Sequence, residues 1–292
     1  MKLTRRGFIK TTVAIGAGAV GAVGAAAASA KEALPVRGST VEDTTAEVVR
    51  WFGAKGFVPV AAAPLISGHS FNGGLNFDDH LAEHGEAQYV VQPCSRVEDV
   101  RKKDVPGTLP LFTIFGFDFA ERTPKAERLK NVVGFLTGPA GLDPGRLRAT
   151  TTKLAEHLFP TLAELGIDAG RIRLQPIEKA KREGAGSGYF APVGHPHQPA
   201  YASLSIECVM ADGSELEVAE ISAEPDGPHS VRGAIGLDRV VMARSDRPIT
   251  WSERLPVFKD AVEQDARRRS VPLPVGYYEM LGLPPPGASK AG

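Results

Sequence analysis

The chain has 292 residues, of which 42% are hydrophobic and 23% charged, so it can bury a sizeable core as one domain or one and a half. Its formal net charge is zero, but the first 30 residues hold four of the 34 basic residues and no acid, which leaves 30 basic against 34 acidic residues in the remainder. A charge near −4 over that remainder argues against a polyanion such as RNA as the partner.

The N-terminus carries the paired-arginine sequence Thr4-Arg5-Arg6-Gly7-Phe8-Ile9-Lys10, an uncharged Ala/Gly-rich stretch, and the small-x-small sequence Ala28-Ser29-Ala30. The stretch holds too few strongly apolar residues for a membrane span. It resembles a twin-arginine signal, which exports folded proteins across the bacterial inner membrane. We therefore expect a signal peptide at residues 1–30, a periplasmic or extracellular protein, and no stable membrane span after cleavage. The alternative is a chance basic–apolar start on a cytoplasmic protein.

The remaining chain is expected to form a flexible lead (31–42), one domain (43–283) and a loose tail (284–292). Thr44 with Glu47 predicts a capping box at the start of a short helix. An extended, proline-interrupted segment follows at residues 57–66.

Strands and helices then alternate. Strands are predicted near 89–94, 109–119, 146–151 and 171–175, and helices near 125–136, 153–165 (kinked at Pro160) and 256–269. The charged, glycine-rich residues 178–188 are expected to form a surface loop.

The clearest hairpin joins strands 202–210 and 215–223 around Asp212-Gly213. With this antiparallel second half, the chain is predicted to be an α+β protein with a mixed, mainly antiparallel sheet flanked by helices.

A two-residue turn would place Glu220 opposite Ser205 and Val218 opposite Glu207, with these four side chains on one face. Glu207 and Glu220 would then be diagonal neighbours, roughly 7–8 Å apart, a span that a divalent ion or a polar ligand can bridge. The alternative is a solvated outer face.

The stretch Val231–Arg244 leads through Gly233, Ala234 and Gly236 into a helix that carries Arg239. Small residues let a helix start lie close to a sheet or a ligand, and a guanidinium one turn in can stack on a ring or bind phosphate. The alternative is an ordinary amphipathic helix after a glycine-rich loop.

Several segments between about Thr45 and Arg244 resemble the catalytic core of a class II aminoacyl-tRNA synthetase, closest to alanyl-tRNA synthetase. Gln92-Pro93-Cys94-Ser95-Arg96 is similar to that family's Q-R-C-x-R segment, and Gly236-Leu237-Asp238-Arg239 to its G-L-E-R sequence. The segment from Thr45 to Ile66 resembles its first helix and strand.

The resemblance implies that the chain binds ATP and Mg²⁺ and activates a carboxylate as an adenylate. Arg96 would bind the α-phosphate, Arg239 and Gly236 would contact the nucleotide, and Glu207 with Glu220 would lie in the nucleotide cleft and hold Mg²⁺. Whether the chain forms a homodimer is left open.

The departures from the family point to a changed substrate. Arg232 stands where the family has the aspartate that anchors the substrate amino group, Ala234 replaces a glycine, and Ala219-Glu220 replaces a tryptophan–asparagine pair. Arg232, with Glu220, would suit a small ligand that carries a carboxylate or phosphate. The resemblance extends to no editing or tRNA-binding domain, so tRNA is not expected as a partner. A second hypothesis is therefore an exported binding protein that has lost ligation.

A third hypothesis is an exported metal or redox protein. His195 and His197 stand at alternate positions, as two ligands of a metal site can, or they form an exposed turn. Cys94 and Cys208 can form one bridge or remain two free thiols.

Overall fold

The computed structural model describes residues 40–75, 86–120, 123–184, 186–190, 201–223 and 232–284. Chain contacts divide the molecule into a short unit, Met1–Val36, and a main unit, Arg37–Gly292, to which all described residues belong. The predicted signal peptide, the His195–His197 pair and nearly all of the predicted tail lie outside the described residues. Within those ranges, no helix is long and apolar enough to cross a membrane.

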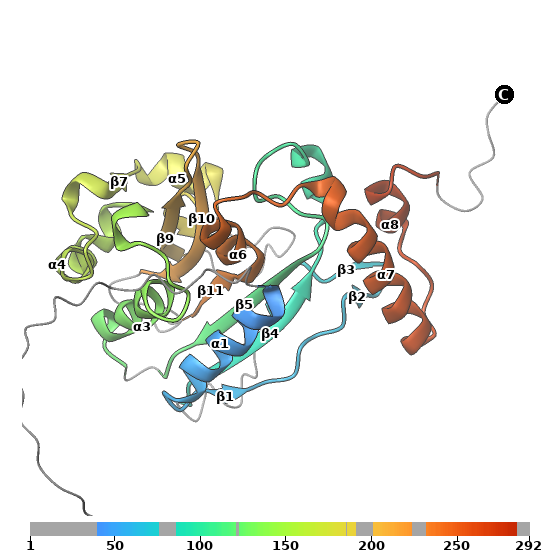
Figure 1. Ribbon diagram of the computed structural model, residues 1–292, viewed down its shortest axis with the longest axis horizontal. Coiled ribbons are helices and arrows are strands. Elements are labelled where there is room, and N and C mark those ends of the chain that lie inside the picture. Colours follow the sequence, from blue (N-terminus) through green and yellow to red (C-terminus); the bar gives the residue numbers. More distant parts are fainter. Residues whose placement is uncertain are drawn as a thin grey trace, which may run out of the picture. The chain divides into compact units, whose positions relative to one another are not determined.

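A mixed sheet is the framework of the main unit (Figure 1), with strand order β1-β4-β5-β11-β10-β9-β6-β7 and β8 paired to β9. The pairs β1–β4 and β6–β7 are parallel, and the other described pairs are antiparallel. The predicted α+β class with a mixed, mainly antiparallel sheet is confirmed. The strands are β1 (Val58–Pro59), β4 (Gln88–Cys94), β5 (Phe112–Asp118), β6 (Leu147–Thr151), β7 (Ile172–Leu174), β8 (Tyr189–Phe190), β9 (Tyr201–Val209), β10 (Glu215–Ser222) and β11 (Arg232–Gly236).

Helices and short 3-10 turns connect these strands, and a small second sheet pairs β2 (Ile66–Ser67) with β3 (Ser70–Phe71). The α-helices are α1 (Val41–Gly53), α3 (Lys125–Thr137), α4 (Phe159–Glu164), α5 (Ile177–Glu183), α6 (Leu237–Ser245), α7 (Trp251–Arg269) and α8 (Val275–Met280). The 3-10 helices are η1 (Val97–Lys102), η2 (Pro144–Arg146), η3 (Lys153–Leu158) and η4 (Ala169–Arg171).

One face of the main sheet is apolar and packs against helices. Successive strand residues point to opposite faces, so alternate positions such as Phe115 and Phe117 of β5 reach the same side. They meet Phe52 of α1, which is fully buried and whose ring lies 4.8 Å from that of Phe115. Residues of α3 and α6 join the same core, and Figure 1 shows α1 and α6 in front of the sheet. Burial of this apolar surface is the main stabilisation of the fold.

A second, smaller core lies between α7, α8 and the β2–β3 sheet. Phe258 of α7 is fully buried, stacks with Tyr277 of α8 at 6.0 Å, and makes an edge-to-face contact with Phe71 of β3 at 5.6 Å. Asp265 of α7 accepts a hydrogen bond from the Ile66 amide at 3.0 Å, which ties the helix to β2. This part of the chain was not predicted as a separate core.

Three local predictions were wrong. The capping box lies one turn before Thr44, because the Thr40 hydroxyl accepts from the Asp43 amide at 3.1 Å and Asp43 accepts in return from the Thr40 amide at 3.2 Å. The last long helix begins at Trp251, since Thr250 caps it and Pro256 is accommodated inside. Part of the predicted loop 178–188 is the helix α5.

Candidate functional site

The opposite face of the main sheet is lined with polar side chains, and we call it the polar face. Cross-strand register places its members together, because residues opposite each other share a face. The polar side chains on this face are Gln88, Gln92, Asp118, Arg232, Glu217, Glu220, Ser222, Ser203, Ser205, Glu207, Arg148, Thr150 and Arg173.

Two described segments lie over parts of this face. Gly74 accepts a hydrogen bond from the Gln92 side chain, and a Cβ on Gly116 would come within 2.5 Å of Leu75. Gly186 donates its amide to Glu220 Oε1 at 3.1 Å. Polar side chains of this face such as Ser205 are fully buried.

A β-bulge decides which carboxylates share the polar face. Glu217 lies opposite Glu207 and Ala219 opposite Ile206, so Val218 is the extra residue. The predicted pairing of Glu220 with Ser205 is confirmed, but the pairing of Val218 with Glu207 was wrong. Because Val218 is an extra residue, the alternation of side chains along β10 shifts by one position. Glu217 and Glu220, three residues apart, therefore face the same side.

The two predicted carboxylates have separate partners. Glu220 Oε1 accepts from the Ser203 hydroxyl at 2.7 Å, and burial together with the charge of Glu217 raises the pKa of Glu220 to about 7. Glu207 accepts from the Thr150 hydroxyl at 3.0 and 3.1 Å, and burial raises its pKa as well. The charge that raises the pKa of Glu220 is that of Glu217, a residue that the sequence did not single out.

Arg239 is held at the edge of the polar face by three acceptors. Its Nη1 donates to Glu217 Oε2 at 2.7 Å and to the Glu217 carbonyl at 3.2 Å, and its Nε donates to the Gly107 carbonyl at 3.2 Å. Gly236 is the N-cap residue of α6, and a Cβ there would approach the Arg239 side chain at 3.4 Å. That distance is an ordinary van der Waals contact, so a small side chain at position 236 would pack against Arg239 without displacing it.

Arg96 is oriented by its neighbours in a similar way. Its Nε donates to the Gly73 carbonyl at 2.9 Å, and its guanidinium lies 5.3 Å from the centre of the Phe112 ring. Its two terminal nitrogens make no hydrogen bond with any described residue. Burial raises the pKa of Asp99 while the charges of Arg96 and Arg239 lower it, so both guanidinium groups act on the same carboxyl.

Arg232 has an acidic partner that sequence reasoning missed. It lies opposite Asp118 of β5, and its Nε contacts Asp118 Oδ2 at 3.0 Å. The side chain of Arg232 is 41% exposed, whereas that of Asp118 is only 9% exposed. The two residues are 114 positions apart, so only the pairing of β5 with β11 brings them together.

Asp238, also missed, positions the start of α6. It is 1% exposed, accepts from the Thr113 amide at 2.6 Å, and pairs with Arg254 of α7 at 2.6 Å. It therefore joins α6 to β5 and α7 beside Arg239.

Two buried hydroxyls on the polar face lack hydrogen-bond partners among the described residues, those of Ser205 and Ser222. They flank the Ser203–Glu220 hydrogen bond: Ser205 lies opposite Glu220, and Ser222 lies opposite Ser203. An unpaired buried hydroxyl is costly, so these groups are natural contacts for a water or a polar ligand.

Within the described ranges, no group of three or more His, Cys, Asp or Glu side chains is arranged to hold a metal ion. Cys94 and Cys208 are both buried and free, which resolves the alternatives left open by the sequence in favour of two thiols.

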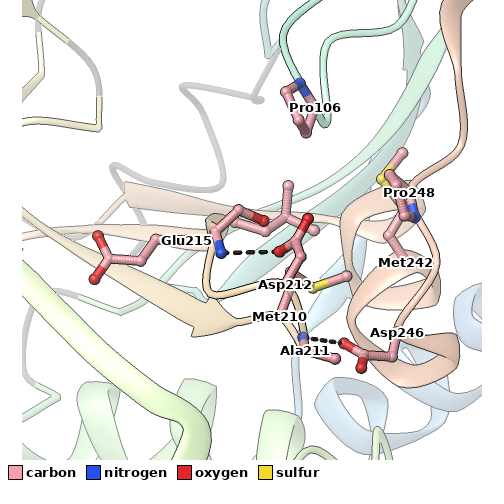
Figure 2. Close-up of a pocket in the computed structure, with 10 residues that line it drawn as sticks. Pro106, Met210, Ala211, Asp212, Glu215, Met242, Asp246 and Pro248 are labelled. Carbon is pink, nitrogen blue, oxygen red and sulfur yellow. Dashed lines mark hydrogen bonds between the residues drawn. The ribbon is translucent and has the colours of Figure 1, made fainter.

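A separate cavity of about 280 Å³ lies at the β9–β10 turn and the C-terminal end of α6 (Figure 2). Met210, Met242 and Leu216 give it an apolar lining, and Asp246 is one of its charged lining residues. Figure 2 shows the Glu215 carboxylate directed away from Met210 and Met242. None of the predicted site residues lines this cavity.

No protein-family profile and no curated protein matches this sequence. Among solved structures, the chain is similar to apo histidyl-tRNA synthetase from S. aureus, with 12% identity over 72% of this chain and 69% of that one and a TM-score of 0.41. It is also similar to aspartyl-tRNA synthetase from Entamoeba histolytica, with 12% identity over 70% of this chain and a TM-score of 0.40. The chain spans 54% of the length of the Entamoeba protein.

Proposed function

We propose that the chain binds ATP with Mg²⁺ on the polar face and activates a small carboxylate as an adenylate. The observation that carries this is the pair Arg96 and Arg239, each oriented through Nε by a backbone carbonyl and both acting on Asp99. Guanidinium groups held in this way are suited to phosphate oxygens, because little side-chain freedom is lost on binding.

In the proposed step, a carboxylate oxygen of the substrate attacks the α-phosphorus, the bond to the β-phosphate oxygen breaks, and pyrophosphate leaves. Arg96 would stabilise the charge on the α-phosphate as it becomes five-coordinate. Arg239 would hold the remaining phosphates or the base. The chemistry is positional and electrostatic, so a few fixed cations are sufficient.

The donor set of the polar face fits Mg²⁺ when the nucleotide supplies further ligands. Mg²⁺ commonly takes one or two carboxylates together with substrate phosphates. Glu220 would hold the ion with Glu207, as the sequence predicts, or with Glu217, whose charge already raises the pKa of Glu220. The ion would neutralise phosphate charge.

The substrate is proposed to be a small carboxylate or phosphate compound rather than an amino acid bound through its amine. Arg232, whose side chain is 41% exposed, is the cation that would attract it, and the Ser222 hydroxyl on the same face could hydrogen-bond to it. A transfer step to tRNA is not part of the proposal.

Calorimetric titration with ATP–Mg²⁺ tests the nucleotide site. We expect binding at millimolar ATP or below, weakened at least about tenfold in Arg239→Ala and in Arg96→Ala, as loss of a charge-assisted hydrogen bond implies. Arg247→Ala is the matched control, since that side chain lies beyond the end of α6, is 66% exposed and pairs with Glu253. Absence of binding at millimolar ATP would overturn the nucleotide proposal.

Pyrophosphate exchange with a panel of carboxylic acids tests the activation step. Exchange that depends on one acid and falls in Arg232→Ala would support activation. The second candidate function is that of a ligand-binding protein without ligation activity. The ion pair between Arg239 and Glu217 favours it, because the Glu217 carboxylate already binds the guanidinium group that would hold the nucleotide. ATP binding without exchange for any acid would favour that candidate.

A further inference from the structure

A second cavity, of about 160 Å³, lies at the edge of the polar face formed by β6 and β7. Its lining residues are Arg148, Gly170, Arg171, Ile172, Arg173, Glu207 and Glu215. None of the lining residues except Glu207 is part of the proposed nucleotide site. The volume is that of roughly five water molecules, enough for one small anion with a few waters.

Three arginines meet at this cavity because of strand register. In the parallel pair β6–β7, Thr150 lies opposite Arg173 and Ala149 opposite Ile172, which puts Arg148 next to Arg171. Like charges on neighbouring strands are destabilising unless an anion lies between them. The sheet therefore gathers three cations at one place, where nearby anions stabilise them.

Each of these arginines has a carboxylate nearby, and that of Arg171 is Asp168, whose Oδ2 lies 3.7 Å from Arg171 Nη2 and whose side chain is 69% exposed. Glu215 pairs with Arg173 and, at 3.5 Å, with Nε of Arg148. Glu207 is 4.0 Å from Arg173 and accepts its hydrogen bonds from Thr150.

Arg148 is the least engaged of the three. Its side chain is 39% exposed, and within the part of the chain that the structure describes its two terminal nitrogens make no hydrogen bond. Arg171, by contrast, donates Nη1 to the Pro144 carbonyl at 2.7 Å, which fixes its position beside Arg148. The cavity thus combines a guanidinium group that is held in place, that of Arg171, with terminal nitrogens of Arg148 that make no hydrogen bond with described residues.

We infer that this cavity is a binding site for one small oxyanion, a phosphate or carboxylate group held by Arg148 and Arg171 with Arg173 beside them. Planar guanidinium groups bind such oxygens through paired hydrogen bonds. The site does not depend on the proposed nucleotide binding, although Glu207 lies opposite both Arg148 and Glu217 and so connects the two places.

The experiment titrates the protein carrying Arg96→Ala, Arg232→Ala and Arg239→Ala with inorganic phosphate and, separately, with succinate. This background removes the other proposed anion sites, those for the nucleotide and for its substrate, so failure of either proposal is distinguishable from failure of the other. Saturable binding with a dissociation constant below about 10 mM is expected for at least one of the two anions. The tighter of the two identifies phosphate or carboxylate as the ligand group.

In the same background, Arg148→Gln should weaken binding at least about tenfold, because it removes charge-assisted donors. Arg267→Gln is the control and should leave binding unchanged, since that side chain is 68% exposed on α7. Glu215→Gln should strengthen binding several-fold, because it removes the carboxylate that competes for Arg148 and Arg173. A purely structural ion-pair cluster would not give that gain.

The inference is overturned if neither anion binds, if Arg148→Gln and Arg267→Gln weaken binding equally, or if Glu215→Gln weakens it. Circular dichroism of each variant separates loss of binding from loss of folding. If Arg148→Gln does not fold, Arg148→Lys replaces it, and the same weakening is expected because a lysine lacks the paired donors.

Discussion

Arg239 Nη1 of helix α6 and Glu217 Oε2 of strand β10 are 2.7 Å apart, although the two residues are 22 positions apart in the sequence. The pair exists because the bulge at Val218 turns Glu217 toward the polar face. Both side chains are partly exposed, at 36% and 26%, so the pair contributes little to the free energy of unfolding. Its main effect is that the Glu217 carboxylate offsets part of the positive charge that Arg239 presents to a ligand.

Glu217→Gln should therefore strengthen binding of ATP measured without Mg²⁺, by about three- to tenfold, since the phosphates no longer compete with a carboxylate for the guanidinium. Calorimetric titration in the presence of a chelator measures this directly. Glu178→Gln, at a side chain 79% exposed on α5, is the charge-matched control. Weaker binding in Glu217→Gln would mean that Glu217 positions Arg239 rather than competing with the ligand.

The stability of the protein should depend on pH through Glu220. Its pKa in the folded protein is raised from 4.5 to about 7, so the folded state binds a proton that the unfolded state releases between those values. The free energy of unfolding should then fall as the pH rises from about 4.5 to about 7, by the order of 1–3 kcal/mol, and be unaffected by this group below that window.

Glu220→Gln should lose this part of the pH dependence, because the amide does not titrate. Urea denaturation at pH 5 and pH 8 gives the measurement. An unchanged slope in the variant would show that another group is responsible, with Glu207 the first to examine because its pKa is also raised.

Gly233 should be required for packing between β11 and its neighbours. A Cβ there would lie 2.4 Å from the Phe117 ring and 2.5 Å from the Glu220 carbonyl, neither of which can move cheaply. Gly233→Ala is therefore expected to lower the free energy of unfolding by about 1–3 kcal/mol.

Gly53→Ala is the control, because no atom lies within 4 Å of its added Cβ and the residue ends α1. That change should be neutral or stabilising by up to about 1 kcal/mol. Thermal unfolding of the two variants makes the comparison, and equal melting temperatures would contradict the packing argument.

The twin-arginine signal remains a prediction from the sequence. Replacing Arg5 and Arg6 by lysine should retain the protein in the cytoplasm, because the paired guanidinium groups are the recognised feature. Cell fractionation measures the distribution, with Lys10→Arg as a control that leaves the pair intact. An unchanged distribution would exclude export by this route.

The sequence by itself was sufficient for features that depend on local pattern. The alternation of residues 202–222 predicted the β9–β10 hairpin, and the run of small residues before Leu237 predicted a helix start with Arg239 one turn in. These patterns involve neighbours along the chain, so the spacing of residue types contains the necessary information.

Only the tertiary structure decided which charged groups meet. The Arg232–Asp118 pair, the Glu217–Arg239 pair and the three-arginine cavity each join segments that strand order and register bring together. The bulge at Val218 changed the partner of Glu207 by one residue, and a shift of one residue in a strand exchanges its faces. Register is set by the packing of the whole sheet, and no local spacing of residues records it.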